Sequence, residues 1–137
     1  MAYWLVKSEP SAWSWNDHFK AGVAEWDGVR NHQANNNMKA MKNGDKGFFY
    51  HSVKEKTIVG VVEVVKEHYP DHTDKSNRFG MVDVKAIEPL KTPVTLAQIK
   101  ADDRLIHLAL VRQSRLSVMP IDAKAWKLIC KLGEVQA

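Results

Sequence analysis

Residues Thr57–His68, with the sequence TIVGVVEVVKEH, set the fold class that we predict for this 137-residue chain. Their branched side chains alternate over both faces of an extended strand: Ile58, Val62 and Val64 on one face, Val59, Val61 and Val65 on the other. A strand that is apolar on both faces has to be covered on both, as in a small closed barrel with helices packed outside it. Gly60 within the stretch predicts a bend or a close backbone approach.

The segments around this strand predict a mixed α+β domain built on a curved or closed sheet. Lys46–Ser52 is expected to pair with it as a hairpin, and the other extended segments are Tyr3–Lys7, Glu25–Val29 and Phe79–Leu90. Helices are expected over Ser11–Lys20 with Ser11 or Ser14 as the cap, from Asn31 to about Met41, from Thr95 to about Ala101, and from Asp122 to just before Gly133. The core stripes of the second and last helices are expected to be Ala34, Met38 and Met41, and Ala125, Leu128, Ile129 and Leu132.

Composition places the chain among ordinary single-domain globular proteins. Hydrophobic residues make up 45% and charged residues 26%, and 137 residues suffice for one core without disulfides. No apolar run approaches the roughly 20 residues that a bilayer requires, and no signal peptide is visible, so we expect no membrane partner and a cytoplasmic location. The single cysteine agrees with a reducing compartment, and the net charge of +4 weakly favours nucleic acid as a partner.

Two dense runs, Tyr3–Pro10 and Trp26–Asn31, combine aromatics, a cation and small polar donors that core packing alone does not require. In the second run, Trp26 and Arg30 are residue types that grip flat polar partners, and the asparagine that ends it can leave helix amides free beside the arginine. This combination predicts a pocket for a planar, hydrogen-bonding ligand. The structural alternatives are a core role for Trp26 and, for Arg30, a buried fork that binds carboxylates such as Asp27 or carbonyls.

Two strand ends supply further candidate side chains. The Lys7-Ser8-Glu9 run can reach a cavity, or it is a solvated strand end in which the lysine and glutamate pair. His51-Ser52 also ends a strand, where the imidazole can read a base edge, act in acid–base chemistry, or close the hairpin by a hydrogen bond.

A cationic segment precedes the last expected strand. It contains Arg112 and Ser114, followed by Arg115-Leu116-Ser117. Such a run is ordinarily a solvated face, but it forms an anion-attracting rim if it folds beside Arg30.

Catalytic and metal chemistry find little support. No serine lies in an activating elbow, there is no glycine-rich phosphate loop, and Cys130 reads as a packed thiol. Two histidines and two aspartates, His68, His72, Asp71 and Asp74, resemble a metal cluster by type, but Pro70 interrupts the segment that would align them. We therefore predict no catalytic residue, no metal and no cofactor.

The chain resembles the EVE domain family over nearly its whole length. The motifs that match, in order, are Tyr3–Pro10, Trp26–Asn31, Gly44-Asp45, Phe49–Ser52, Gly60–Val64, Tyr69–Asp71 and Arg115–Val118. The resemblance implies one domain over residues 1–137 with a PUA-like fold, a mixed β pseudobarrel flanked by short helices. It also implies a cavity that accepts a modified nucleobase, as YTH domains of the same broad group accept methylated adenine.

The family's pocket motifs fall on twelve residues of this chain: Lys7, Ser8, Glu9, Trp26, Val29, Arg30, Asn31, His51, Ser52, Arg115, Leu116 and Ser117. Phe79 joins this ligand-binding set where the family typically has tryptophan. Three other positions depart from the family pattern: Asn35 replaces a common arginine, Val53 a usual asparagine and Met119 a frequent glutamine. The change at position 35 removes a cation, and the change at position 79 keeps an aromatic face without an indole donor.

The resulting expectation is a monomeric, non-enzymatic reader that binds DNA or RNA and holds one flipped or unpaired, modified base. Trp26 and Phe79 would stack on the base, the polar side chains Ser8, Asn31, His51 and Ser52 would bond its edge, and Arg30 and Arg115 would hold flanking phosphates. Two alternatives remain: an enzyme acting on a modified nucleotide with Glu9 or His51 as acid–base, and a protein-interaction module with a vestigial pocket.

Overall fold

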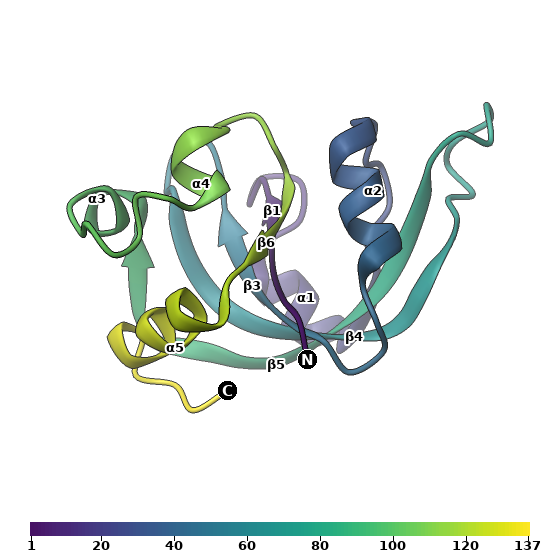
Figure 1. Ribbon diagram of the computed structural model, residues 1–137. Helices are drawn as coiled ribbons and strands as arrows, with labels where there is room; N and C mark the ends of the chain where they lie inside the picture. The colour runs from purple at the N-terminus through teal and green to yellow at the C-terminus, as the bar shows by residue number, and fades with distance from the viewer.

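The computed structural model describes residues 1–137 as six strands and five helices (Figure 1). The strands are β1 (Tyr3–Ser8), β2 (Val23–Glu25), β3 (Lys46–His51), β4 (Thr57–Pro70), β5 (Gly80–Thr95) and β6 (Val118–Ile121). The helices are α1 (Trp15–Ala21), α2 (His32–Ala40), α3 (Leu96–Lys100), α4 (Ala109–Arg112) and α5 (Ala123–Leu132). None of these helices is long and apolar enough to cross a bilayer.

All six strands belong to one mixed sheet with the order β2-β5-β4-β3-β1-β6. The β1–β3 pair is parallel, and every other neighbouring pair is antiparallel. The edge strands β2 and β6 are not hydrogen-bonded to each other, so the sheet is curved but open. Figure 1 shows β4 and β5 bending along the molecule, with α2 on one side of the fold and α3, α4 and α5 on the other. This is the α+β, PUA-like arrangement that was predicted.

The strand β4 lies in the middle of the sheet, and both of its faces are covered. The consecutive residues Val61 and Val62 point to opposite faces, and both are buried. At Gly60 a Cβ atom would lie only 2.4 Å from the ring of Trp15, the first residue of α1. The predicted close approach at this glycine is therefore made by an aromatic side chain, and it seats the start of α1 against the sheet.

Polar side chains start the helices where the sequence predicted. Asn31, Thr95 and Asp122 cap α2, α3 and α5, each accepting a backbone N–H of the first turn. The Asn31 Oδ1 atom lies 2.9 Å from the amide nitrogen of Ala34. These caps set the direction in which each helix leaves the sheet.

Three predicted boundaries were wrong. The first helix begins at Trp15 and not at Ser11, because the backbone carbonyl of Glu9 accepts the amides of residues 12 and 13 in a turn around Pro10; of the two expected caps, Ser14 is the one used. The extended segment Glu25–Val29, expected to be interrupted at Asp27-Gly28, is instead the strand Val23–Glu25, and Gly28 beyond it has a φ of +78°. The strand β5 continues past residue 90 to Thr95 because the start of β4 offers it a partner.

The core face of α5 also differs from the predicted stripe. Ala125 and Ile129 are buried as expected, but Trp126 and Cys130 are buried in place of Leu128 and Leu132. The Trp126 ring stacks on Phe48 and Tyr3, with ring centroids 4.0 and 4.5 Å apart. These stacking contacts rotate the helix by about one position from the aliphatic pattern.

Candidate functional site

A cavity of about 600 Å³ lies where the curved sheet stays open, between β2 and the ends of β1 and β6. Volumes in this range are typical of small-molecule sites. Thirteen residues line it: Lys7, Ser8, Glu9, Ala12, Trp13, Ala24, Glu25, Trp26, Asp27, Gly28, Val29, Arg30 and Ser117. The cavity is thus assembled from three distant parts of the chain that only the sheet brings together.

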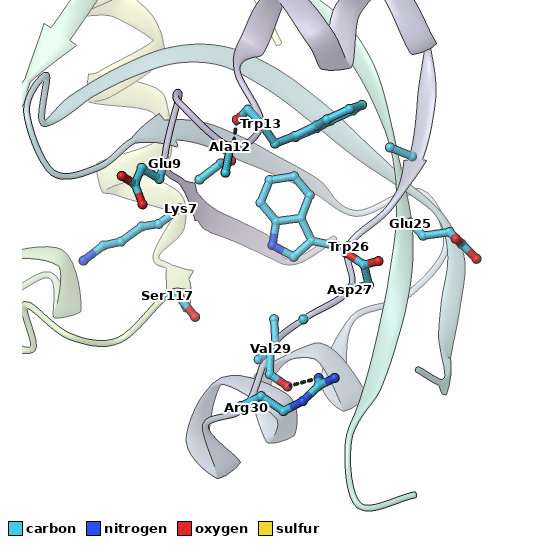
Figure 2. Close-up of a pocket in the computed structure, with 13 residues that line it drawn as sticks. Lys7, Glu9, Ala12, Trp13, Glu25, Trp26, Asp27, Val29, Arg30 and Ser117 are labelled. Carbon is cyan, nitrogen blue, oxygen red and sulfur yellow. Dashed lines mark hydrogen bonds between the residues drawn. The ribbon is translucent and has the colours of Figure 1, made fainter. Parts of the chain in front are cut away.

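Trp26 forms the centre of this lining (Figure 2). Its side chain is buried and meets Phe49 edge to face, with centroids 5.4 Å apart. The indole N–H of Trp26 makes no hydrogen bond within the protein, and no buried side-chain donor in the structure lacks a partner. The N–H therefore faces the open space of the cavity as an uncommitted donor.

A second indole, that of Trp13, lies beside Trp26 in the lining. Its N–H is committed, because it donates to Nδ1 of His18 at 3.0 Å. The backbone carbonyl of Trp13 accepts from the hydroxyl of Ser8, which ties the turn before α1 to the end of β1. The sequence reasoning missed Trp13, although a tryptophan just after a Pro-containing strand end was a usable signal.

His18 supports both tryptophans from behind. The side chain is fully buried, and its Nε2 atom lies 2.9 Å from the carbonyl oxygen of Val84. A carbonyl can only accept, so Nε2 carries the proton and Nδ1 is free to accept from Trp13. Burial lowers the pKa of His18 below its ordinary value, which agrees with this neutral tautomer. The His18 ring also contacts the Trp26 ring, at a centroid distance of 5.9 Å.

Asp71, a buried carboxylate that does not itself line the cavity, holds the residues of the cavity floor in place. Asp71 accepts the amide of Gly28 at 2.8 Å and forms an ion pair with Arg30 at 3.1 Å. Arg30 also donates to Thr73 and lies over the Phe79 ring, 5.8 Å from its centroid. Arg30 also donates to the carbonyl of Val29 at 3.1 Å, so the alternative of a fork on carboxylates or carbonyls is present, with Asp71 as the carboxylate in place of the named Asp27.

The opposite wall is formed by the end of β1. Lys7 donates from Nζ to the carbonyl of Ser114 at 2.9 Å, and partial burial lowers the pKa of Lys7. Glu9 accepts from Ser11, so the Lys7–Glu9 pair that the structural alternative required is not formed. Figure 2 shows Lys7 and Ser117 on the same side of Trp26.

Carboxylates outnumber cations in this lining. Glu9, Glu25 and Asp27 are lining residues, whereas the cations are Lys7 and the Asp71-paired Arg30. The Glu25 carboxylate accepts from His72 at 2.9 Å, which lowers the pKa of Glu25 and raises that of His72. Such a lining suits a neutral ring with hydrogen-bond donors better than a phosphate.

The cavity brings together seven of the thirteen residues predicted as ligand-binding: Lys7, Ser8, Glu9, Trp26, Val29, Arg30 and Ser117. The other six lie outside its lining: Asn31, His51, Ser52, Phe79, Arg115 and Leu116. Among these, His51 accepts the backbone amide of Trp15 at 3.0 Å and bonds Glu55 at 3.1 Å, so it joins α1 to the hairpin as the structural alternative described. Glu9 and His51 therefore do not meet as an acid–base pair in one pocket.

The histidines and aspartates that resembled a metal cluster have separate partners. His68 bonds Asn35 at 2.9 Å, and His72 bonds Glu25. Asp74 caps the loop before β5 by accepting the amides of Arg78 and Phe79. No group of three such side chains in the structure is arranged to hold a metal ion.

Loss of the Asp71 carboxylate is expected to loosen the cavity floor. Burial acts to raise the pKa of Asp71, but hydrogen bonds from Thr73, Gly28 and Arg30 outweigh it and lower the pKa to about 2, from 3.8. The folded state thus favours the charged form, so the stabilisation is complete above pH 4 and is lost as the pH falls toward 2. We expect Asp71→Asn to lower the free energy of unfolding at pH 7 by about 1–3 kcal/mol.

Denaturant unfolding between pH 7 and pH 2 measures this effect. The matched control is Asp102→Asn, which breaks an exposed pair with Arg104 and is expected to cost less than about 1 kcal/mol. Equal losses in the two variants would contradict the role of Asp71.

Comparison with known proteins gives consistent matches over the whole chain. The family model described as the EVE domain matches residues 2–132. The chain is 37% identical to mouse thymocyte nuclear protein 1, over 98% of this chain and 74% of the relative. The NMR structure of Rpa0253 from Rhodopseudomonas palustris is 55% identical, with a TM-score of 0.92 over 98% of this chain and 94% of that one.

A structure with bound nucleic acid is also similar. Human thymocyte nuclear protein 1 in complex with 5-methylcytosine-containing DNA is 33% identical to this chain. The two superpose with a TM-score of 0.90 over 100% of both chains.

Proposed function

The chain belongs to the EVE domain family, and on that premise we propose that it binds nucleic acid and holds one unpaired or flipped, modified base in the cavity around Trp26. The observation that carries the proposal is the Trp26 indole, which presents a ring and a free N–H to a cavity of about 600 Å³. A heteroaromatic base has a flat face for the ring and acceptor atoms for the N–H. This pairing suits a nucleobase better than an aliphatic ligand.

The energetics favour a base that is already unpaired. Taking a base out of a duplex costs a few kcal/mol, and least for a mismatched or single-stranded one. Stacking on an aromatic side chain returns about 1–3 kcal/mol per base. Hydrogen bonds and phosphate contacts have to offset the part of the extrusion cost that stacking does not. The cavity alone therefore binds a base in single-stranded nucleic acid more readily than in a duplex.

The polar lining of the cavity supplies both donors and acceptors for hydrogen bonds to the edge of a base. The Trp26 N–H and the Ser117 hydroxyl are donors with no partner inside the protein, and Asp27 is a carboxylate without one. A carboxylate accepts from an exocyclic amino group, as carboxylates do from cytosine N4. The complex of human thymocyte nuclear protein 1 with 5-methylcytosine-containing DNA supports 5-methylcytosine as the first base to test.

A binding series at fixed salt tests the function. Short single-stranded and duplex oligonucleotides would carry 5-methylcytosine, cytosine or thymine at one position, with N6-methyladenine and adenine as a second pair. We expect one modified base to bind at least fivefold more tightly than its unmodified partner. Thymine controls for the amino group, because it shares the methyl group of 5-methylcytosine but has a carbonyl at that position. Equal, weak binding of all probes that fades with salt would reduce the function to a basic surface and contradict the proposal.

A further inference from the structure

A second, smaller depression lies next to the base cavity and has the opposite chemistry. Its volume is about 320 Å³, and seven residues line it: Asn31, Gln33, Arg112, Gln113, Ser114, Arg115 and Leu116. The lining contains two arginines and no carboxylate, and only one of the seven residues is hydrophobic. By contrast, the base cavity is lined by three carboxylates and two cations.

The two depressions share their walls. Asn31 directly follows Arg30 of the base cavity, and Leu116 directly precedes Ser117 of that cavity. Lys7, which lines the base cavity, donates to the carbonyl of Ser114 in the second depression at 2.9 Å. A nucleotide whose base enters the first site thus has its backbone beside the second.

The framework of the second depression is held by bonds that do not use its cations. Asn37 donates to the carbonyl of Val118 at 2.7 Å, which joins α2 to β6 across the depression's two walls. The Asn31 side chain caps α2, and Leu116 is buried beneath the segment that carries the arginines. The walls are therefore preorganised even though the arginine side chains are exposed.

Arg112 and Arg115 are uncommitted cations. Neither forms an ion pair, whereas Arg30 pairs with Asp71 and Arg104 pairs with Asp102. A guanidinium offers a planar fork of donors that fits phosphate oxygens in a bidentate manner. A lining without carboxylates lets both arginines act on an anion at full charge.

We propose that this depression, between the start of α2 and residues 112–116, binds the backbone phosphate next to the base held at Trp26. The inference rests on the proposed base-binding function and names the part of the nucleic acid that the second depression takes. It changes the sequence expectation at one position: the arginine that acts with Arg115 is Arg112, because Asp71 already occupies Arg30. The depression contributes affinity, register and salt dependence, and base preference comes from the neighbouring cavity.

The salt dependence of binding tests the site. We expect Arg112→Ala and Arg115→Ala each to reduce the magnitude of the negative slope of log K against log[salt] by about one. Each variant should bind the modified and the unmodified probes more weakly than the native protein does, by the same factor. Arg104→Ala is the matched control, since it removes the same charge from an exposed pair elsewhere. Slopes for Arg112→Ala and Arg115→Ala equal to that of the control would overturn the site.

Replacing one backbone phosphate by an uncharged methylphosphonate shows which phosphate the second depression binds. One methylphosphonate is placed on either side of the target base in turn, and each probe is measured with the native protein and with Arg115→Ala. We expect the methylphosphonate at one of the two positions to weaken binding to the native protein but to cause no further loss of binding to the variant. Additive losses at both positions would overturn the assignment, because the arginine and the phosphate would then act independently.

The same data separate this inference from the base-binding function. If no probe shows base preference but the slopes and the methylphosphonate coupling behave as expected, the phosphate site stands and the base-binding function fails. If Arg115→Ala removes base preference while the salt slope stays unchanged, the arginine contacts the base and the phosphate assignment is wrong.

Discussion

Replacing Trp26 by alanine is expected to remove base preference and to weaken binding of the preferred oligonucleotide by about 5- to 150-fold. The range corresponds to the loss of about 1–3 kcal/mol of stacking on one aromatic ring. Trp26 is also buried against Phe49 and His18, so the alanine variant loses about 3–5 kcal/mol of stability as well. Binding isotherms and thermal unfolding therefore have to be measured on the same preparations.

A gentler variant separates binding from folding. Trp26→Phe keeps an aromatic ring in the core but removes the free indole N–H, so we expect it to fold, to retain most of the stacking and to lose the edge contact. Trp126→Phe is the control, because this tryptophan of α5 is also buried but stacks on Phe48, away from the cavity, and its N–H is bonded to the carbonyl of Ala137. Unchanged base preference in Trp26→Phe and in folded Trp26→Ala would show that the base binds elsewhere.

His18→Leu is expected to cost about 1–3 kcal/mol of stability and to weaken base binding through Trp13. The substitution removes both hydrogen bonds of His18, the one to the carbonyl of Val84 and the one from the half-buried N–H of Trp13, at about 0.5–1.5 kcal/mol each. It also removes the ring that holds both tryptophans in place. His107→Leu is the control, since His107 is half exposed and bonds only Asp122.

The native protein provides a second measurement that does not depend on whether the variant folds. Burial lowers the pKa of His18, so the unfolded chain binds the proton more strongly than the folded one. The stabilisation is therefore complete above the ordinary pKa of 6.5 and declines as the pH falls below it. By NMR, the His18 ring is expected to stay neutral from pH 8 to below pH 6.5. An ordinary titration at 6.5 would contradict the buried-tautomer assignment.

Local features of this chain were predictable from residues a few positions apart. The caps at Asn31, Thr95 and Asp122 and the strand apolar on both faces at Thr57–His68 depend on short-range geometry, and the structure has them where they were predicted. The family motifs placed Trp26 among the expected pocket residues for the same reason, since motifs are local. The boundary near Pro10 was wrong because turn bonds outweighed the local pattern, and the strand near Gly28 ended early because that glycine has a positive φ and bonds Asp71.

The sequence by itself determined the α+β class, the starts of α2, α3 and α5, and the presence of a tryptophan and arginine run that core packing did not need. Tertiary structure alone decided which polar groups stay free for a ligand. Asp71 lies 41 residues from Arg30 and 43 from Gly28 along the chain. Its ion pair with Arg30 neutralises that cation, and its bond to Gly28 shapes the cavity floor. His18 likewise takes up the N–H of Trp13 but leaves that of Trp26 open. The physical reason is that a hydrogen-bond donor is satisfied by whatever acceptor the fold brings within about 3 Å, and distance along the chain does not set that partner.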